Sequence, residues 1–250
     1  MNFNNIDIEP IFGSKNIIND IFDKNGFELY EHLKNKFIFL FSFYNQKVPA
    51  IHLNELCNTA EIFVPKNSKI IKPLFTHELL HLNLLANGIN NKKAIIDCIT
   101  NNRLPEVFNM ATEDIMFTYN FLDHFIIYHD FKRMGYIDDV FVADYNENRF
   151  NKIVETYLEY SFHTTRPDDR AKSFYISKYI GLRAPICQIK NYSEAFNKMK
   201  NLYTPLYNIC KSFVDKYENI SKENYDIIHE KYYKVIDDFI IGLKTVLSKK

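Results

Sequence analysis

The sequence lacks several features that would assign the protein to a specialised class. Its 250 residues contain no tryptophan, only 6 glycines and 8 prolines, and 4 cysteines. So few glycines and prolines leave little room for flexible linkers, which favours a compact and mostly helical chain. Hydrophobic residues make up 46% and charged residues 25%. This balance is typical of globular proteins and excludes an intrinsically disordered chain.

Paired cysteines, a leader segment and long apolar runs are also missing. No CxxC pair or compact disulfide pattern occurs, and such isolated cysteines favour reduced thiols. The N-terminus has no basic segment followed by an apolar one, so no signal peptide is expected. The longest apolar run, Phe37 to Tyr44, is too short to cross a bilayer. We therefore expect a soluble cytoplasmic protein without a membrane partner. The cysteines are Cys57, Cys98, Cys187 and Cys210.

The net charge names no partner. Lysine plus arginine and aspartate plus glutamate both number 31, so the formal net charge is zero. Without a global basic field, the composition does not indicate a nucleic-acid partner. It leaves the oligomeric state open.

Hydrophobic periodicity predicts an α+β fold that is mainly helical, with a small N-terminal sheet. Residues 15–35 are typical of short helices broken near Asn25-Gly26, and apolar runs at 37–41, 50–53 and 61–64 are typical of strands. From Pro73 the pattern turns helical, and Asn87-Gly88 suits a left-handed helix exit, which predicts a helix over 73–87. Further helices are predicted at 91–100, 104–129, 148–163, 168–182, 191–217 and 221–248. We expect a core in residues 1–145 and a helical extension in 146–250, which could form one continuous domain.

The strongest chemical signal is an HExxH motif formed by His77, Glu78 and His81. Residues four apart lie on one face of a helix, so both imidazoles can bind one metal ion. Glu78 lies about 100° around the helix from His77, where it can reach a metal-bound water without becoming a ligand. Zinc lowers the pKa of such a water toward about 7, and Glu78 can then act as general base.

The alternative is that His77 and His81 are ordinary core histidines on an apolar helix. Glu78 is the only charged residue between Leu74 and Asn91. A lone carboxylate in so apolar a helix is costly unless a nearby group compensates it. This favours the metal site.

A zinc site of this kind needs a third protein ligand. The long motif HExxHxxGxxH is absent, so the ligand must come from a later element. On the predicted 104–129 helix, polar residues share one face without any lysine or arginine among them. We predict Glu113, at the centre of this stripe, as the third ligand. Asp114 could hydrogen-bond a ligand imidazole as an outer partner or replace Glu113. The stripe could instead be a solvated face, and the other possible ligands are Asp97, Glu106 and His124.

These residues carry a resemblance to a known family. Thr76 to His81, followed by a helix containing Asn109 to Asp114, resembles the gluzincin branch of the zincin metallopeptidases. The resemblance implies a zincin-like core and zinc bound by His77, His81 and Glu113. It also implies that an edge strand before the motif helix holds substrate as an extended peptide.

A group that stabilises the oxyanion is also needed when water attacks a carbonyl. In the zincin family it is usually a downstream histidine or tyrosine, and Tyr157, Tyr160, His163 and Arg166 are the candidates here. We predict His163 as this catalytic residue. The tyrosines could equally serve packing, and His52 and His129 show no partner pattern.

The resulting hypothesis is a zinc-dependent metallopeptidase that hydrolyses peptide bonds in a polypeptide substrate, with metal-bound water as nucleophile and Glu78 as base. The first alternative is a zincin-fold binding or regulatory module without peptidase activity. The second is a deformylase-like enzyme with Cys57 as a ligand, but the glycine-rich segment of such enzymes is absent.

Overall fold

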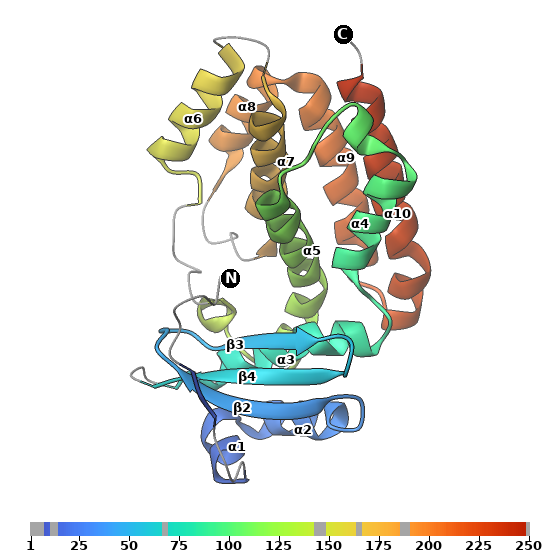
Figure 1. Cartoon of the computed structure of the whole chain (residues 1–250). Coiled ribbons are helices and arrows are strands. Elements are labelled where there is room, and N and C mark those ends of the chain that lie inside the picture. Colours follow the sequence, from blue (N-terminus) through green and yellow to red (C-terminus); the bar gives the residue numbers. More distant parts are fainter. Residues whose placement is uncertain are drawn as a thin grey trace. The chain divides into compact units, whose positions relative to one another are not determined.

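The computed structural model describes residues 8–10, 15–66, 70–142, 149–163, 167–185 and 191–248. The α+β, mainly helical class is confirmed (Figure 1). The chain divides into two compact units. The N-terminal unit comprises Met1–Ala86 and Asp130–Tyr145, and the helical unit comprises Asn87–His129 and Asn146–Lys250. The sequence places the end of the core at residue 145, whereas the structure groups Asn87–His129 with the C-terminal helices.

The N-terminal unit contains one sheet with the strand order β1-β2-β4-β3. β2 pairs parallel with β4, and β3 pairs antiparallel with β4, so β3 is an edge strand. Asn58 has a φ of 50°, a left-handed conformation that asparagine tolerates better than most residues, and it closes the β3–β4 connection. The predicted strands are confirmed, and β1 was not predicted. The strands are β1 (Ile8–Pro10), β2 (Ile38–Tyr44), β3 (Ala50–Asn54) and β4 (Thr59–Pro65).

Aromatic side chains attach helix α2 (Lys24–Leu33) to β2. The Tyr30 ring lies 5.0 Å from the Phe39 ring and 6.3 Å from the Phe41 ring, between centroids. α2 follows α1 (Lys15–Ile21), and the break falls at residues 22–23 rather than at Asn25-Gly26. The reason is that the Asp23 side chain accepts a hydrogen bond from the Gly26 backbone N–H, which makes Asp23 the N-cap of α2.

The motif helix α3 spans Lys72–Ala86 and packs on α2 and β3. Leu79 and Leu80 are fully buried in the core, which anchors the segment between the two histidines. The helix exit at Gly88 has a φ of 77°, as predicted, because glycine adopts this left-handed conformation without steric cost. The 3-10 turn η2 (Asp138–Val140) also belongs to this unit.

Gly26 permits a close approach between α2 and the start of the motif. A Cβ atom added to Gly26 would lie 2.5 Å from Thr76 Oγ1, next to His77, and 3.1 Å from Phe22. We expect Gly26→Ala to lower the free energy of unfolding by about 1–3 kcal/mol, because overpacking outweighs the gain in helix propensity. Urea denaturation measures this loss. Gly242→Ala is the control, since its Cβ would meet only two methyl groups of the Ile209 side chain, at 3.2 and 3.6 Å. Equal stability of Gly26→Ala and the native protein would contradict the expectation.

The helical unit is built from α4 to α10. Its elements are α4 (Asn91–Asn101), η1 (Leu104–Glu106), α5 (Thr112–Arg133), α6 (Lys152–His163), α7 (Asp169–Arg183), α8 (Ser193–Leu202), α9 (Thr204–Ile220) and α10 (Tyr225–Leu247). The last four residues of α5 belong to the N-terminal unit. The helix predicted over 221–248 is confirmed as α10, and its Ile228, Ile236 and Leu243 are buried on one apolar face.

Two predicted helices are interrupted in the structure. The prediction of a helix over 104–129 was wrong at its start, because α5 begins only at Thr112. The preceding backbone donors of Asn109 and Ala111 bond the Asp169 and Ser173 side chains of α7 instead of a helical turn. The 191–217 helix is split at Tyr203, because Pro205 stands at the first turn of α9, where it fits best.

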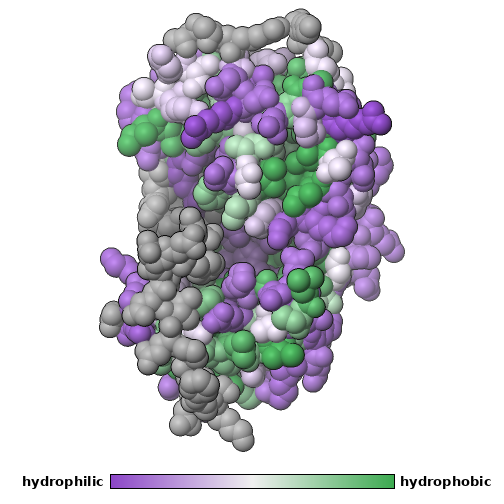
Figure 2. All heavy atoms as spheres, in the orientation of Figure 1, coloured by the Kyte–Doolittle hydropathy of each residue, from purple (hydrophilic) through white to green (hydrophobic). Residues whose placement is uncertain are grey.

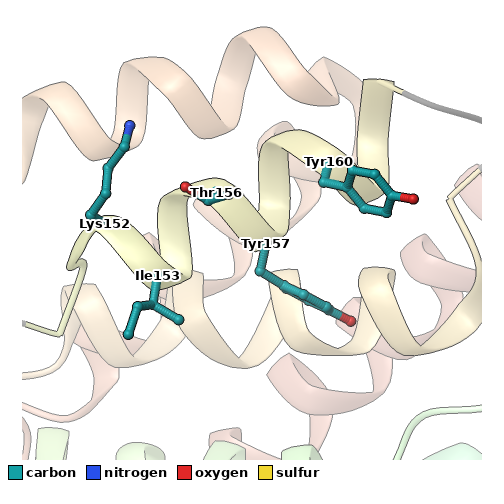
Figure 3. Close-up of a pocket in the computed structure, with 5 residues that line it drawn as sticks. All are labelled: Lys152, Ile153, Thr156, Tyr157 and Tyr160. Atoms are coloured by element: carbon teal, nitrogen blue, oxygen red, sulfur yellow. The ribbon is translucent and has the colours of Figure 1, made fainter.

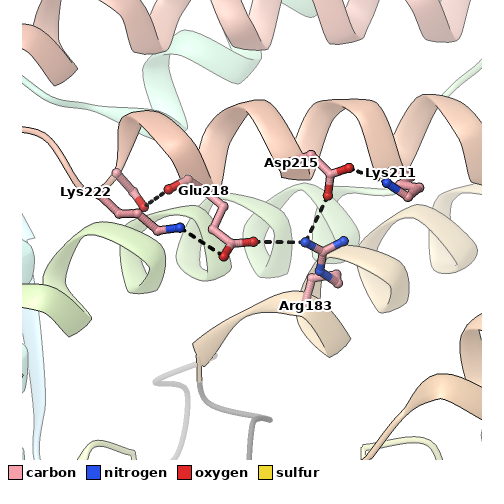
Figure 4. Close-up of polar contacts among 6 residues, drawn as sticks. Arg183, Lys211, Asp215, Glu218 and Lys222 are labelled. Carbon is pink, nitrogen blue, oxygen red and sulfur yellow. Dashed lines mark hydrogen bonds and ion pairs between the residues drawn. The ribbon is translucent and has the colours of Figure 1, made fainter.

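Polar contacts at the surface join α7 to α9. Figure 4 shows the Arg183 guanidinium between two carboxylates, 3.0 Å from Asp215 and 2.9 Å from Glu218. Lys211 of α9 pairs with Asp215, and Lys222, just after the end of α9, pairs with Glu218. Because several charges share the contacts, this network orients α7 more firmly than a single surface ion pair would.

Hydrophobic and hydrophilic side chains are mixed on the surface of the described residues (Figure 2). On the face shown in Figure 2, hydrophobic side chains form small groups among hydrophilic ones, as on most proteins. Within the described ranges, every helix is too short or too polar to traverse a membrane.

Candidate metal centre

Helix α3 brings the two motif histidines together, as the i, i+4 spacing predicts. Their Nε2 atoms lie 3.2 Å apart, and the ring planes meet at 72° with centroids 5.0 Å apart. Two nitrogens bound to one tetrahedral zinc ion at about 2.0–2.1 Å would be separated by about 3.3 Å. The observed separation therefore fits one shared metal ion. It also fits a hydrogen bond between the rings.

His77 lies in a buried, partly aromatic environment. It is 5% exposed, and the Phe141 ring stands edge-on to it at 4.7 Å between centroids. Burial, with a smaller contribution from the charge on His81, holds the pKa of His77 well below its usual value. Because a metal binds only the neutral imidazole, this shift keeps His77 competent as a ligand at neutral pH and below.

A polar network supports the helix turn that precedes His77. The Tyr136 hydroxyl donates to Asp23 Oδ1 at 2.6 Å and lies 3.2 Å from Thr76 Oγ1. The Asn25 side chain donates to the Met134 carbonyl oxygen at 2.8 Å. These contacts tie the segment after α5 to α2 and α3, so they stabilise the position of the histidine face.

The Glu78 carboxylate is half-buried beside the edge strand β3. Burial raises the pKa of Glu78, while the charge on His81 and a hydrogen bond from the Ile51 backbone oppose part of this rise. Burial, with a smaller contribution from the same carboxylate, raises the pKa of Tyr44 to about 12. Sequence reasoning missed Tyr44, whose hydroxyl donates to the Val48 carbonyl oxygen. A carboxylate with a raised pKa is a better proton acceptor, as a general base requires.

The predicted third ligand and its neighbour lie in the first turn of α5. Glu113 is exposed, whereas Asp114 is buried and accepts a hydrogen bond from Ser177 Oγ at 2.7 Å. Of the alternatives, Asp97 pairs with Lys93, and Glu106 lies 3.9 Å from Arg103. His124 is 4% exposed in the second half of α5. The roles of Glu113 and Asp114 stay predictions.

Three of the four candidates for oxyanion stabilisation belong to α6. His163 is exposed at the last residue of this helix. Tyr157 packs edge-on against Phe174 at 5.0 Å, and Tyr160 is 70% exposed. Both tyrosines line a surface recess of about 480 Å³ with Lys152, Ile153 and Thr156 (Figure 3). Packing therefore accounts for Tyr157, and Arg166 lies outside the described residues.

Comparison of the chain with protein families, with characterised proteins and with solved structures finds no match. The functional argument therefore depends on the chemistry of the site itself.

Proposed function

We propose that the protein is a zinc-dependent metallopeptidase that hydrolyses peptide bonds in a polypeptide substrate. The observation that carries the proposal is the pair of imidazoles on α3, whose Nε2 atoms are 3.2 Å apart, with Glu78 beside the edge strand. A purely structural zinc site does not need a base, so the carboxylate favours a hydrolytic site over a binding module.

His124 is the third ligand that we favour. With His77 and His81, it makes a group of three side chains that could hold one metal ion. Three neutral imidazoles are a known ligand set for catalytic zinc and leave one position for water or substrate.

The geometry of α5 supports His124 over Glu113. In the N-terminal unit, the Phe131 ring contacts the Phe141 ring at 5.0 Å, and Phe141 contacts His77 at 4.7 Å. His124 precedes Phe131 by two helical turns, about 10 Å, on the same face of this continuous helix. Glu113 precedes Phe131 by five turns, about 27 Å. Glu113 therefore lies three turns further along α5 from this aromatic contact than His124 does.

Glu78 performs the proton transfer in this proposal. Zinc, when bound, supplies a water molecule of lowered pKa and polarises the carbonyl of the scissile bond. Glu78 accepts the proton of the attacking water and donates it to the leaving amine. β3 is the edge strand of its sheet, so its free side can pair with an extended peptide as an added strand.

Removal and return of zinc test the function. We expect the zinc-loaded protein to cleave an unstructured polypeptide such as casein, because the ion activates the nucleophile. Treatment with 1,10-phenanthroline should lower the rate at least about tenfold, and added zinc should restore it. Mass spectrometry of the products measures cleavage. A protein that binds one zinc ion per chain and cleaves nothing in a diverse peptide library would be the binding module instead.

A further inference from the structure

A buried chain of hydrogen bonds connects three helices of the helical unit. The Tyr217 hydroxyl of α9 donates to Asn91 Oδ1 of α4 at 2.7 Å. Asn91 Nδ2 then donates to Asp123 Oδ1 of α5 at 2.8 Å. Tyr217 and Asn91 are 0% and 2% exposed. Tyr217, Asn91 and Asp123 together form the relay.

The direction of the relay is set by its two ends. A carboxylate only accepts hydrogen bonds, so Asn91 must present its NH₂ group to Asp123 and its oxygen to Tyr217. Burial, and secondly the negative charge of Asp123, hold the pKa of Tyr217 well above its usual value, so its hydroxyl stays a donor. A buried amide is costly unless its groups are bonded, and here both ends of the Asn91 side chain have a partner.

The position of the relay links it to the proposed ligands. Asn91 is the first residue of α4, five positions after α3 ends at Ala86. Asp123 directly precedes His124 on α5. The hydrogen bond at Asp123 therefore restricts the rotation of α5 about its axis, one residue before His124, the proposed third ligand. A rotation of about 20° would move a histidine ring tip, about 7 Å from the helix axis, by about 2–3 Å, which is enough to take it out of ligand geometry.

We propose that Asn91, Asp123 and Tyr217 are positioning residues, which hold α5 in the rotation that His124 needs to bind the metal ion. This inference rests on the proposed function. The relay acts through the helix backbone rather than through the ion, and sequence reasoning missed it because its members are 32 and 126 positions apart.

Tyr217→Phe tests the inference, because it removes one hydroxyl and keeps the ring that packs against Phe125 and Phe213. We expect the zinc dissociation constant, measured by competition with a fluorescent chelator, to rise about 10–100-fold, the usual cost of losing an outer-shell partner. The matched control is Tyr175→Phe. Tyr175 is also fully buried and donates to the Met199 carbonyl oxygen at 2.7 Å, without contributing to the relay.

Both variants lose one buried hydrogen bond, so a merely structural role would lower their urea midpoints alike and leave zinc affinity equal. Equal zinc affinity in the two variants would overturn the inference. A second readout uses metal-free protein, in which the His124 ring signals in ¹H–¹⁵N spectra are assigned with His124→Gln. These signals should shift in Tyr217→Phe and stay unchanged in Tyr175→Phe. An unshifted His124 signal would refute the relay even in a chain that binds no zinc, whereas a shift without zinc binding would refute only the proposed function.

Discussion

Glu78→Gln is expected to lower the turnover number about 10²–10⁴-fold while the protein keeps its zinc ion. Glutamine has nearly the same shape as glutamate, but it cannot accept the proton of the attacking water. Because Glu78 is not a ligand in this proposal, the two imidazoles of α3 and their 3.2 Å spacing should be unaffected. Initial rates on a cleaved peptide and zinc content by atomic emission measure the two effects.

The control for this experiment is Glu28→Gln, which removes a carboxylate that is 65% exposed on α2 of the same unit. Its activity should stay within about twofold of the native protein, since a surface carboxylate contributes little. If Glu78→Gln cleaved peptide at the native rate, Glu78 would not be the base. If it lost zinc as well as activity, Glu78 would be a ligand, and the proposed division of roles would be wrong.

His124→Ala is expected to weaken zinc binding at least about 100-fold, whereas Glu113→Gln should change it less than about twofold. A directly bound ligand should cost more than an outer-shell partner, whose loss typically costs about 10–100-fold. Competition with a fluorescent zinc chelator measures both dissociation constants. His81→Ala serves as the positive control, and His32→Ala, at an exposed site on α2, as the negative control.

The opposite outcome would restore the ligand set that the gluzincin resemblance implies. If Glu113→Gln lost the ion and His124→Ala kept it, Glu113 would complete the site. The distinction has a chemical consequence. Three neutral imidazoles leave the double charge of zinc uncompensated, whereas a carboxylate ligand would cancel half of it. The full charge polarises a substrate carbonyl more strongly and lowers the pKa of the bound water further, which eases the proton transfer to Glu78.

The local parts of this site could be predicted from the sequence. The pairing of His77 with His81 follows from 3.6 residues per turn, a property of any helix. The exit of α3 at Gly88 follows from the one residue type that adopts a left-handed conformation without cost. The strands β2, β3 and β4 follow from short apolar runs between turn-forming residues. Each of these conclusions needs only neighbours within a few positions.

Tertiary structure alone decided the remainder. Helical periodicity places Glu113 and His124 on the same face of α5, but it does not say which of the two completes the proposed site. Within the N-terminal unit, Phe141 packs against His77 from 64 positions away, and Phe131 packs on Phe141. Likewise, no local pattern shows that Asp169 and Ser173 replace the first helical bonds expected before α5, or that Tyr217 reaches Asn91. Sequence spacing determines which side chains share a face, whereas long-range packing determines what that face contacts, because contacts between distant segments leave no periodic signal in the chain.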